Sequence, residues 1–175
     1  MRILHISNFV QRHKGRLFWN HAFKISNGFI RNGHSVYNFS DRDISRINIT
    51  NKFNNEKSTN NDLISTFKNY NPDLLIIGHA DKIHNITILE LKKINPSLKI
   101  IEWNVDNYLL DNTENKLKHR SEVVDHIFIT NGDEKISTAA LNNTSISFFP
   151  NIFDLSIKNN KIFENKTYDK DLFFA

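Results

Sequence analysis

The alternation of short apolar runs with amphipathic stretches is the feature that most limits how this chain can fold. It begins with an apolar strand at residues 3–7, a polar basic loop at 8–16, an amphipathic helix from near residue 17 to 32, and a second strand at 34–40. This β-α-β order predicts two parallel strands joined by a crossover helix. Because ligands in open α/β sheets bind beyond the carboxyl ends of the strands, it also predicts the edge where a site would lie.

The same alternation continues as far as residue 149. Further strands are predicted at 73–78, 98–103, 125–130 and 145–149, and further helices at 62–70, 86–94, 113–124 and 133–141. The Asn-rich stretch 44–61 predicts a loop with weak helical character, and Ile86, Leu89 and Ile94 are expected to face the core. Together these elements predict an α/β fold with a Rossmann-like, doubly wound and mostly parallel sheet of about six strands, covered by helices on both faces.

The composition excludes several classes of protein and site. The 175 residues suit one α/β domain and contain no cysteine, which excludes disulfides and thiolate chemistry. No apolar run approaches the roughly 20 residues of a membrane-spanning helix, and no signal peptide is visible before the first strand, so a cytoplasmic location is expected. The net charge of +4 is mild and the Lys and Arg residues are spread along the chain, so no nucleic-acid partner is expected.

Five segments carry more specific patterns. They are the first strand at 1–6, the Arg-Asn-Gly-His join within 28–36, the Asn-Pro-Asp strand entry at 71–76, the strand ending in Thr at 125–131 and the Pro-Asn-Ile-Phe-Asp segment within 149–154. In this order they resemble the N-terminal half of GT-B glycosyltransferases, particularly the CgeB-like and group 1 types, although Ile152 stands where the family pattern has Gly. Gly33 suits a left-handed helix end. Pro72 suits the entry to a buried strand, and Pro150 suits the end of the sheet.

The resemblance implies a division of the chain. Residues 1–155 would form the Rossmann-like, acceptor-side domain, and residues 156–175 the interdomain segment and the start of a truncated second domain. The partners implied are a glycan or glycoconjugate acceptor and, through a missing or separate C-terminal domain, a nucleotide-sugar donor. The isolated chain is then expected to be inactive. The alternative interpretation is a stand-alone, non-catalytic, flavodoxin-like ligand-binding module.

The loop after the first strand holds the densest basic group, formed by Arg12, His13, Lys14, Gly15 and Arg16. At this edge of the sheet it could bind a phosphate or carboxylate of the acceptor, with amide donors from the following helix N-terminus. It also suits peripheral contact with a membrane surface. The plain alternative is a solvated basic loop. Because the pattern G-x-G-x-x-G is absent, no dinucleotide cofactor is expected.

Polar residues also follow the third and fourth predicted strands. His79 and Asp81 follow residues 73–78, and Asn104 and Asp106 follow residues 98–103. The resemblance implies a sugar-contacting or catalytic group after the fourth strand, so Asp106 is the candidate base toward an acceptor hydroxyl. The alternative is an Asp that caps a turn. The His-x-Asp-x-x-His spacing of residues 79–84 lacks evident further ligands, so no metal site is predicted.

The second and fifth strands end in weaker candidates. Asp41 and Arg42 follow the second strand and are interpreted as sugar or acceptor contacts, or as residues that cap a helix start. Thr130 and Asn131 end the fifth strand and are expected at the edge of the cleft.

Overall fold

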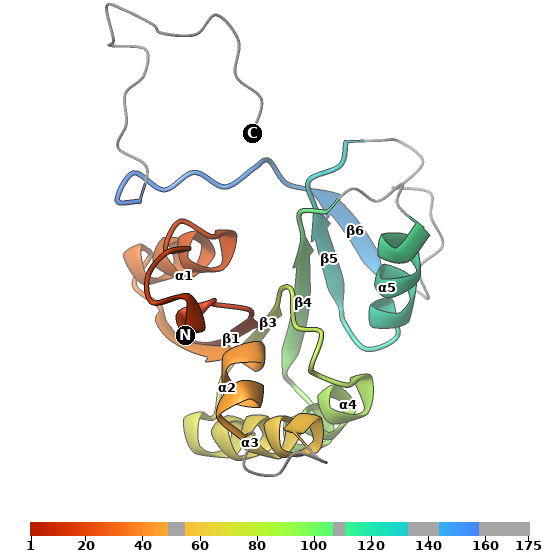
Figure 1. The fold of residues 1–175 in the computed structure, drawn as a ribbon. Coiled ribbons are helices and arrows are strands. Elements are labelled where there is room, and N and C mark those ends of the chain that lie inside the picture. Colours follow the sequence, from red (N-terminus) through yellow and green to blue (C-terminus); the bar gives the residue numbers. More distant parts are fainter. Residues whose placement is uncertain (49–54, 107–110, 133–143, 158–175) are drawn as a thin grey trace, which may run out of the picture.

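The computed structural model describes residues 1–48, 55–106, 111–132 and 144–157, and it shows a single six-stranded sheet with helices packed on it (Figure 1). The strands are β1 (Arg2–Ser7), β2 (Ser35–Ser40), β3 (Leu74–Ile77), β4 (Lys99–Asn104), β5 (His126–Ile129) and β6 (Ser145–Phe148). Their order is β2-β1-β3-β4-β5-β6 and every neighbouring pair is parallel. The predicted fold class is confirmed.

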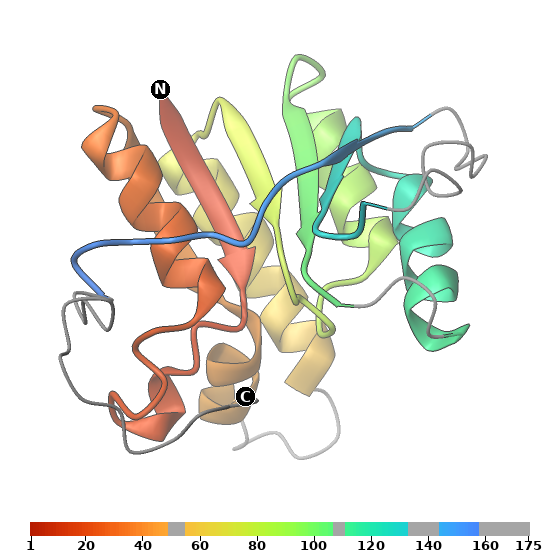
Figure 2. The same cartoon turned by 90° about the horizontal axis from the view of Figure 1, so that it is seen from above.

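The helices lie on both faces of this sheet (Figures 1 and 2). They are a 3-10 turn η1 (Gln11–His13), α1 (His21–Arg31), α2 (Asp41–Ile47), α3 (Asn55–Tyr70), α4 (Asn85–Ile94) and α5 (Asp111–Ser121). α1 packs on the face that contains Ile3, Ile76 and Trp103. α3, α4 and α5 cover the opposite face. None of the described helices is long and apolar enough to cross a membrane.

The first helix begins later than its apolar pattern suggests. Asn20 caps it by accepting a hydrogen bond from the Phe23 N–H at 3.1 Å, so α1 starts at His21 and the predicted start near residue 17 is wrong. Its end agrees with the prediction. Gly33 has a φ of 80°, and the His34 N–H donates to the Phe29 carbonyl at 3.1 Å, as in a left-handed helix end.

The stretch 44–61, predicted as a loop, contains most of α2 and the start of α3. Its Asn-rich pattern hides the helix because its buried residues are polar and hydrogen-bonded. Asn60 donates to the Lys82 carbonyl at 2.8 Å and accepts from the His84 N–H at 3.1 Å. Thr59 bonds the Asn55 carbonyl at 2.8 Å. Buried polar groups with partners replace the apolar stripe that periodicity detects.

The orientation predicted for α4 is also wrong. Ile86 and Leu89 are 74% and 44% exposed, whereas Ile88 and Leu91 are buried against the sheet. Thr87 takes the third inward position, where its hydroxyl donates to Asn60 Oδ1 at 2.7 Å. The side of α4 that faces the core therefore includes Thr87 and its bond to Asn60, which the apolar periodicity of the helix does not reveal. The helix predicted at 133–141 lies outside the described residues.

A buried hydrogen-bond chain joins three strands and α1. The Trp103 indole N–H donates to His5 Nε2 at 3.0 Å, which requires the proton of the neutral imidazole to sit on Nδ1. His5 Nδ1 then donates to Ser26 Oγ at 2.8 Å, and Ser26 donates to Asn38 Oδ1 at 2.7 Å. Burial lowers the pKa of His5 to about 3, so the ring stays neutral.

The segment after β6 crosses the α1 face of the sheet and reaches α1 (Figure 2). Asp154 anchors it there through Arg31 at 2.8 Å and Asn27 at 2.9 Å. Burial opposes ionisation of Asp154, but the hydrogen bonds from Arg31, Asn27 and Ser156 outweigh it and hold its pKa well below the usual range. The domain boundary predicted after residue 155 falls inside this anchored segment.

The close approach of Trp103 to Gly78 predicts a steep cost for one added methyl group. In Gly78→Ala the new Cβ would lie 2.3 Å from the Trp103 ring and 2.8 Å from Ser7 Oγ, so we expect a loss of about 1–3 kcal/mol in the free energy of unfolding. Gly28→Ala in α1 is the matched control, because the added Cβ would have no neighbouring atom within 4 Å. This variant should raise the free energy of unfolding by about 0.5–1 kcal/mol. Urea unfolding measures both variants, and equal stabilities would contradict this packing.

Candidate functional site

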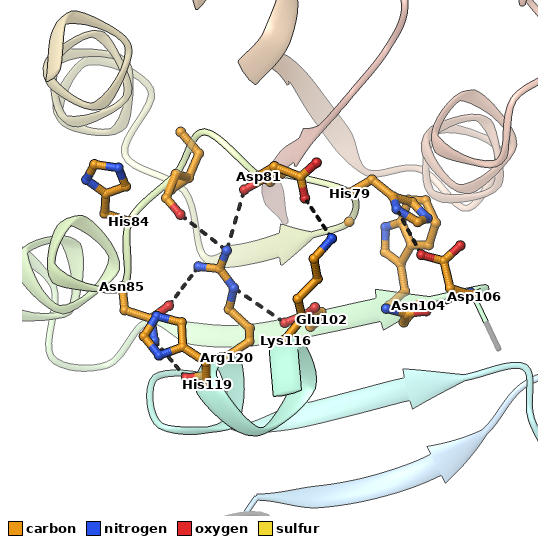
Figure 3. Close-up of a pocket in the computed structure, with 14 residues that line it drawn as sticks. His79, Asp81, His84, Asn85, Glu102, Asn104, Asp106, Lys116, His119 and Arg120 are labelled. Carbon is orange, nitrogen blue, oxygen red and sulfur yellow. Dashed lines mark hydrogen bonds and ion pairs between the residues drawn. The ribbon is translucent and has the colours of Figure 1, made fainter. Parts of the chain in front are cut away.

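A pocket of about 550 Å³ opens at the carboxyl edge of the sheet (Figure 3). Three elements form it: the loop that follows β3, the end of β4, and one side of α5. The lining residues are Gly78, His79, Ala80, Asp81, Ile83, His84, Asn85, Glu102, Trp103, Asn104, Asp106, Lys116, His119 and Arg120. Its position agrees with the edge expected for ligands of parallel α/β sheets, and its volume is within the range of small-molecule sites.

Four of the sequence-predicted residues meet in this pocket: His79, Asp81, Asn104 and Asp106. Asp106 Oδ2 lies 3.7 Å from His79 Nδ1, and the Asp106 side chain is 52% exposed at the rim. Asn104 Oδ1 accepts the Asp106 N–H at 2.7 Å, so Asn104, not Asp106, makes the turn-capping bond. The carboxylate of Asp106 remains available to a ligand at the pocket mouth.

Asp81 is held between two cations. It pairs with Arg42 of α2, and Lys116 Nζ of α5 lies 4.0 Å from its other oxygen. Partial burial would raise its pKa, but the hydrogen bond from Arg42 and the charges of Arg42 and Lys116 lower the pKa below the usual value. Arg42 therefore acts on the pocket through Asp81 without lining it.

Asp41 lies below the surface and is fully buried at the start of α2. Its Oδ2 accepts the Lys82 N–H at 3.1 Å, which ties the β3–α4 loop to α2. Burial raises its pKa, and its Oδ1 has no hydrogen-bond partner among the described residues. Asp41 therefore lies where the alternative prediction puts it, at the start of a helix, and it does not line the pocket.

The basic loop is tied to the body of the protein at its first residue. Arg12 Nη1 lies 3.2 Å from Asp43 Oδ1 and 2.9 Å from Asn8 Oδ1, so its charge is matched inside the fold. Asp43 also accepts the N–H groups of Gln11 and Arg12. His13, Lys14, Gly15 and Arg16 are exposed, and neither they nor Arg12 line the larger pocket.

A smaller pocket of about 170 Å³ lies where this loop begins, beside the N-terminus of α1. It shares two walls with the larger pocket, His79 and Trp103. Val10, at its edge, has a φ of 53°, a left-handed conformation that is strained for a β-branched residue. Phe9 anchors the strained turn, because it is fully buried and its N–H donates to Ser40 Oγ at 3.0 Å.

Thr130 and Asn131 lie beyond β5 and outside the lining of both pockets. The Thr130 N–H donates to the Asn104 carbonyl at 3.2 Å, and its hydroxyl donates to the Val105 carbonyl at 3.4 Å. Thr130 thus supports the turn that carries Asp106. The structure brings it beside the predicted site without placing it inside.

Sequence reasoning missed Glu102, which faces the pocket from the middle of β4 (Figure 3). It is 7% exposed, and burial raises its pKa to about 8 although Arg120 acts in the opposite direction. An acidic residue inside the apolar run Ile-Ile-Glu-Trp was the available signal, because a buried carboxyl group is expensive unless it has a role or a partner.

Sequence reasoning also missed three residues of α5 that line the pocket: Lys116, His119 and Arg120. Arg120 Nη1 donates to Asn85 Oδ1 at 3.0 Å and Nη2 to the Ile83 carbonyl at 3.2 Å, so it holds the β3–α4 loop in place. Their spacing of three and four residues, which puts them on one side of a helix, was the available signal. Within the described ranges, no group of three or more acidic or His side chains could hold a metal ion.

The raised pKa of Glu102 predicts a pH-dependent stability. The folded state keeps a proton that the unfolded chain releases above about pH 4.5, so the wild-type free energy of unfolding falls as the pH rises from about 4.5 to about 8. Glu102→Gln removes this titration. Its stability relative to the wild type should rise by about 1–4 kcal/mol between pH 5 and pH 8, measured by urea unfolding.

The matched control is Glu90→Gln, which changes the same group at an exposed position of α4. Its unfolding free energy should follow the wild type across the same pH range. A Glu102→Gln curve parallel to the wild-type curve would contradict the raised pKa.

The comparisons with known proteins assign no family to this site. No protein-family model matches the chain, and no curated protein sequence matches it.

Proposed function

We propose that this chain is the acceptor-binding half of a GT-B glycosyltransferase, with the nucleotide-sugar donor bound by a second domain. The ordered resemblance of five segments motivates the proposal. The observation that carries it is the pocket at the carboxyl edge of β3 and β4, which collects His79, Asp81, Asn104 and Asp106. This is the edge at which the resemblance implies an acceptor.

The chemistry of the lining supports a hydroxyl-rich ligand. Carboxylates at Asp81 and Asp106 accept hydrogen bonds, Lys116 donates them, and the amide of Asn104 can do both. The imidazole of His79 packs edge-on against Trp103, with ring centroids 5.5 Å apart. A polar rim over an aromatic wall suits a saccharide, whose ring offers both hydroxyl groups and C–H surfaces.

Asp106 is the proposed base of the transfer. Its carboxylate takes the proton of the acceptor hydroxyl while the acceptor oxygen bonds to the anomeric carbon of the donor. The bond from that carbon to the nucleotide diphosphate breaks, and the diphosphate leaves with the electron pair. Its exposure at the pocket mouth supports this role, because the donor must approach from outside this domain.

The proposed partners are a glycan or glycoconjugate acceptor and the separate donor domain. The proposed location is the cytoplasm. The exposed cations Lys14 and Arg16 support a peripheral contact with an anionic membrane surface, where glycoconjugate acceptors are presented. The spread of the other cations along the chain does not favour nucleic acid.

Saccharide binding tests the site. In saturation-transfer NMR with a panel of mono- and disaccharides, we expect binding that weakens about tenfold in Asp106→Asn and in His79→Ala, since each loses a hydrogen bond to the ligand. Glu90→Gln, on the outside of α4, should bind like the wild type. Absence of saccharide binding by the wild type would contradict the proposal.

Catalysis by the isolated chain is a separate prediction. Because the donor site belongs to the second domain, we expect no sugar transfer and no nucleotide release when the chain is incubated with acceptors and a panel of nucleotide sugars. Liquid chromatography with mass detection measures both products. Turnover of any nucleotide sugar would contradict this prediction, because it would place a donor site within this chain.

A further inference from the structure

The turn that leads into α1 combines two aromatic side chains with two cations. This basic-aromatic turn comprises residues 14–19. Phe18 is 56% exposed and Trp19 is 46% exposed. Lys14 and Arg16 are also exposed, and neither forms an ion pair with another residue in the described part of the chain. Isolated exposed apolar residues are normal, whereas adjacent aromatic rings beside unmatched cations indicate an interaction surface.

The acidic residues are unevenly distributed along the sequence. The first 40 residues contain no Asp or Glu and six basic residues, namely Arg2, Arg12, Lys14, Arg16, Lys24 and Arg31. The whole chain has a net charge of +4, so the residues after position 40 carry a net negative charge. Such an asymmetry favours contact between the N-terminal part of the chain and an anionic surface.

The fold uses most of these cations elsewhere. Arg12 and Arg31 are paired with buried carboxylates, and Lys24 is itself only 4% exposed. Arg2 begins β1 and therefore lies at the opposite edge of the sheet. The two cations of the basic-aromatic turn remain available at the carboxyl edge. Two are few for a nucleic-acid backbone, because a nucleic-acid-binding face normally neutralises several phosphates.

Hydrogen bonds hold the basic-aromatic turn in a defined shape. Before it, Asp43 accepts the N–H groups of Gln11 and Arg12 at 2.8 and 3.1 Å. After it, Asn20 Nδ2 donates to the Asn8 carbonyl at 3.1 Å. Successive backbone hydrogen bonds of 3.0 to 3.3 Å link the residues between these two points. The aromatic rings are thus presented on a preorganised backbone, which lowers the entropic cost of binding.

The basic-aromatic turn adjoins the candidate site. β1 leads into its loop at the carboxyl edge of the sheet (Figure 2). Asn20 and His21 follow the turn directly and line the smaller pocket, which shares His79 and Trp103 with the larger one. A surface bound by the turn would therefore lie beside the edge at which the acceptor is proposed to bind.

We infer that the basic-aromatic turn docks the protein on an anionic lipid bilayer, with the rings of Phe18 and Trp19 inserted among the headgroups. Lys14 and Arg16 would contact the anionic headgroups around them. Aromatic rings suit the bilayer interface, and reversible anchoring requires an apolar and an electrostatic signal together. The inference deepens the peripheral contact in the proposed function and rests on it for the choice of a bilayer. Vesicle binding is measured without sugar, so the two can fail separately.

Co-sedimentation of the full chain with lipid vesicles tests the surface. The wild type should sediment with vesicles of mixed phosphatidylcholine and phosphatidylglycerol, and not with vesicles of phosphatidylcholine alone. Lys14→Ala and Arg16→Ala should each weaken binding about fivefold, because each removes one cation from the anionic surface. Phe18→Ala and Trp19→Ala should each weaken it about tenfold, because each removes apolar area buried on docking.

Two matched variants control for exposed residues elsewhere. Lys93→Ala removes an exposed cation of α4, and Phe148→Ala removes a ring of β6 that is 60% exposed. Both should sediment like the wild type. If they weaken binding as much as the variants of the basic-aromatic turn do, this turn is not the docking surface and the inference is wrong.

Tryptophan fluorescence reports insertion directly. The chain has two tryptophans, of which Trp19 is 46% exposed and Trp103 is 5% exposed. On anionic vesicles the emission should shift to shorter wavelengths and should be quenched by lipids brominated on their acyl chains. Trp19→Phe keeps an aromatic ring and should still sediment with the vesicles. It should lose the shift and the quenching, because Trp103 stays inside the fold.

The other outcomes overturn the inference. Sedimentation without a change in Trp19 emission would show adsorption by charge alone, and equal binding to phosphatidylcholine would show that charge has no part. Displacement from vesicles by a single-stranded oligonucleotide would indicate nucleic acid as the partner, and a dimer lost in Phe18→Ala would indicate a second copy. Saccharide binding without vesicle binding overturns this inference alone, whereas vesicle binding without saccharide binding supports it and contradicts only the acceptor site.

Discussion

The hydrogen bond from the Trp103 indole to His5 is the interaction on which the site depends. It lies in the interior, where an unpaired polar group is costly, and it continues through Ser26 to Asn38 so that each member has a partner. The chain joins β4, β1, β2 and α1. Because it holds one side of Trp103, the other side becomes a rigid wall that both pockets share, and Gly78 leaves the space for that wall.

Beside this wall, one pocket holds three carboxyl groups in three environments. Glu102 is buried, its Oε2 has no hydrogen-bond partner among the described residues, and burial raises its pKa to about 8. The pKa of Asp81 is instead lowered by Arg42 and Lys116. Asp106 stands exposed at the mouth. Environments that separate the pKa values of neighbouring acids are the usual means by which one site both donates and accepts protons. The pocket therefore holds acidic groups whose pKa values are shifted in opposite directions.

The errors made from the sequence have a common cause. The start of α3 is not predicted because Asn60 and Thr59 are buried with hydrogen-bond partners. The inward side of α4 is predicted wrongly because Thr87 faces inward and bonds Asn60. The sequence likewise does not reveal that Arg12 pairs with Asp43, 31 residues away along the chain. In each case a polar side chain meets a distant polar partner. Periodicity and local charge do not register such pairs, because both describe the neighbourhood along the chain.

The sequence by itself determined the parallel α/β sheet and the edge that bears polar residues, because strand and helix periods and helix-ending residues such as Gly33 and Pro72 act locally. It placed His79 and Asp106 at that edge for the same reason. Only the tertiary structure decided that Glu102 would face Arg120, since the two residues lie on β4 and α5 and meet through the packing of that helix on the sheet. Burial and the proton it retains are properties of these surroundings, which no local pattern contains.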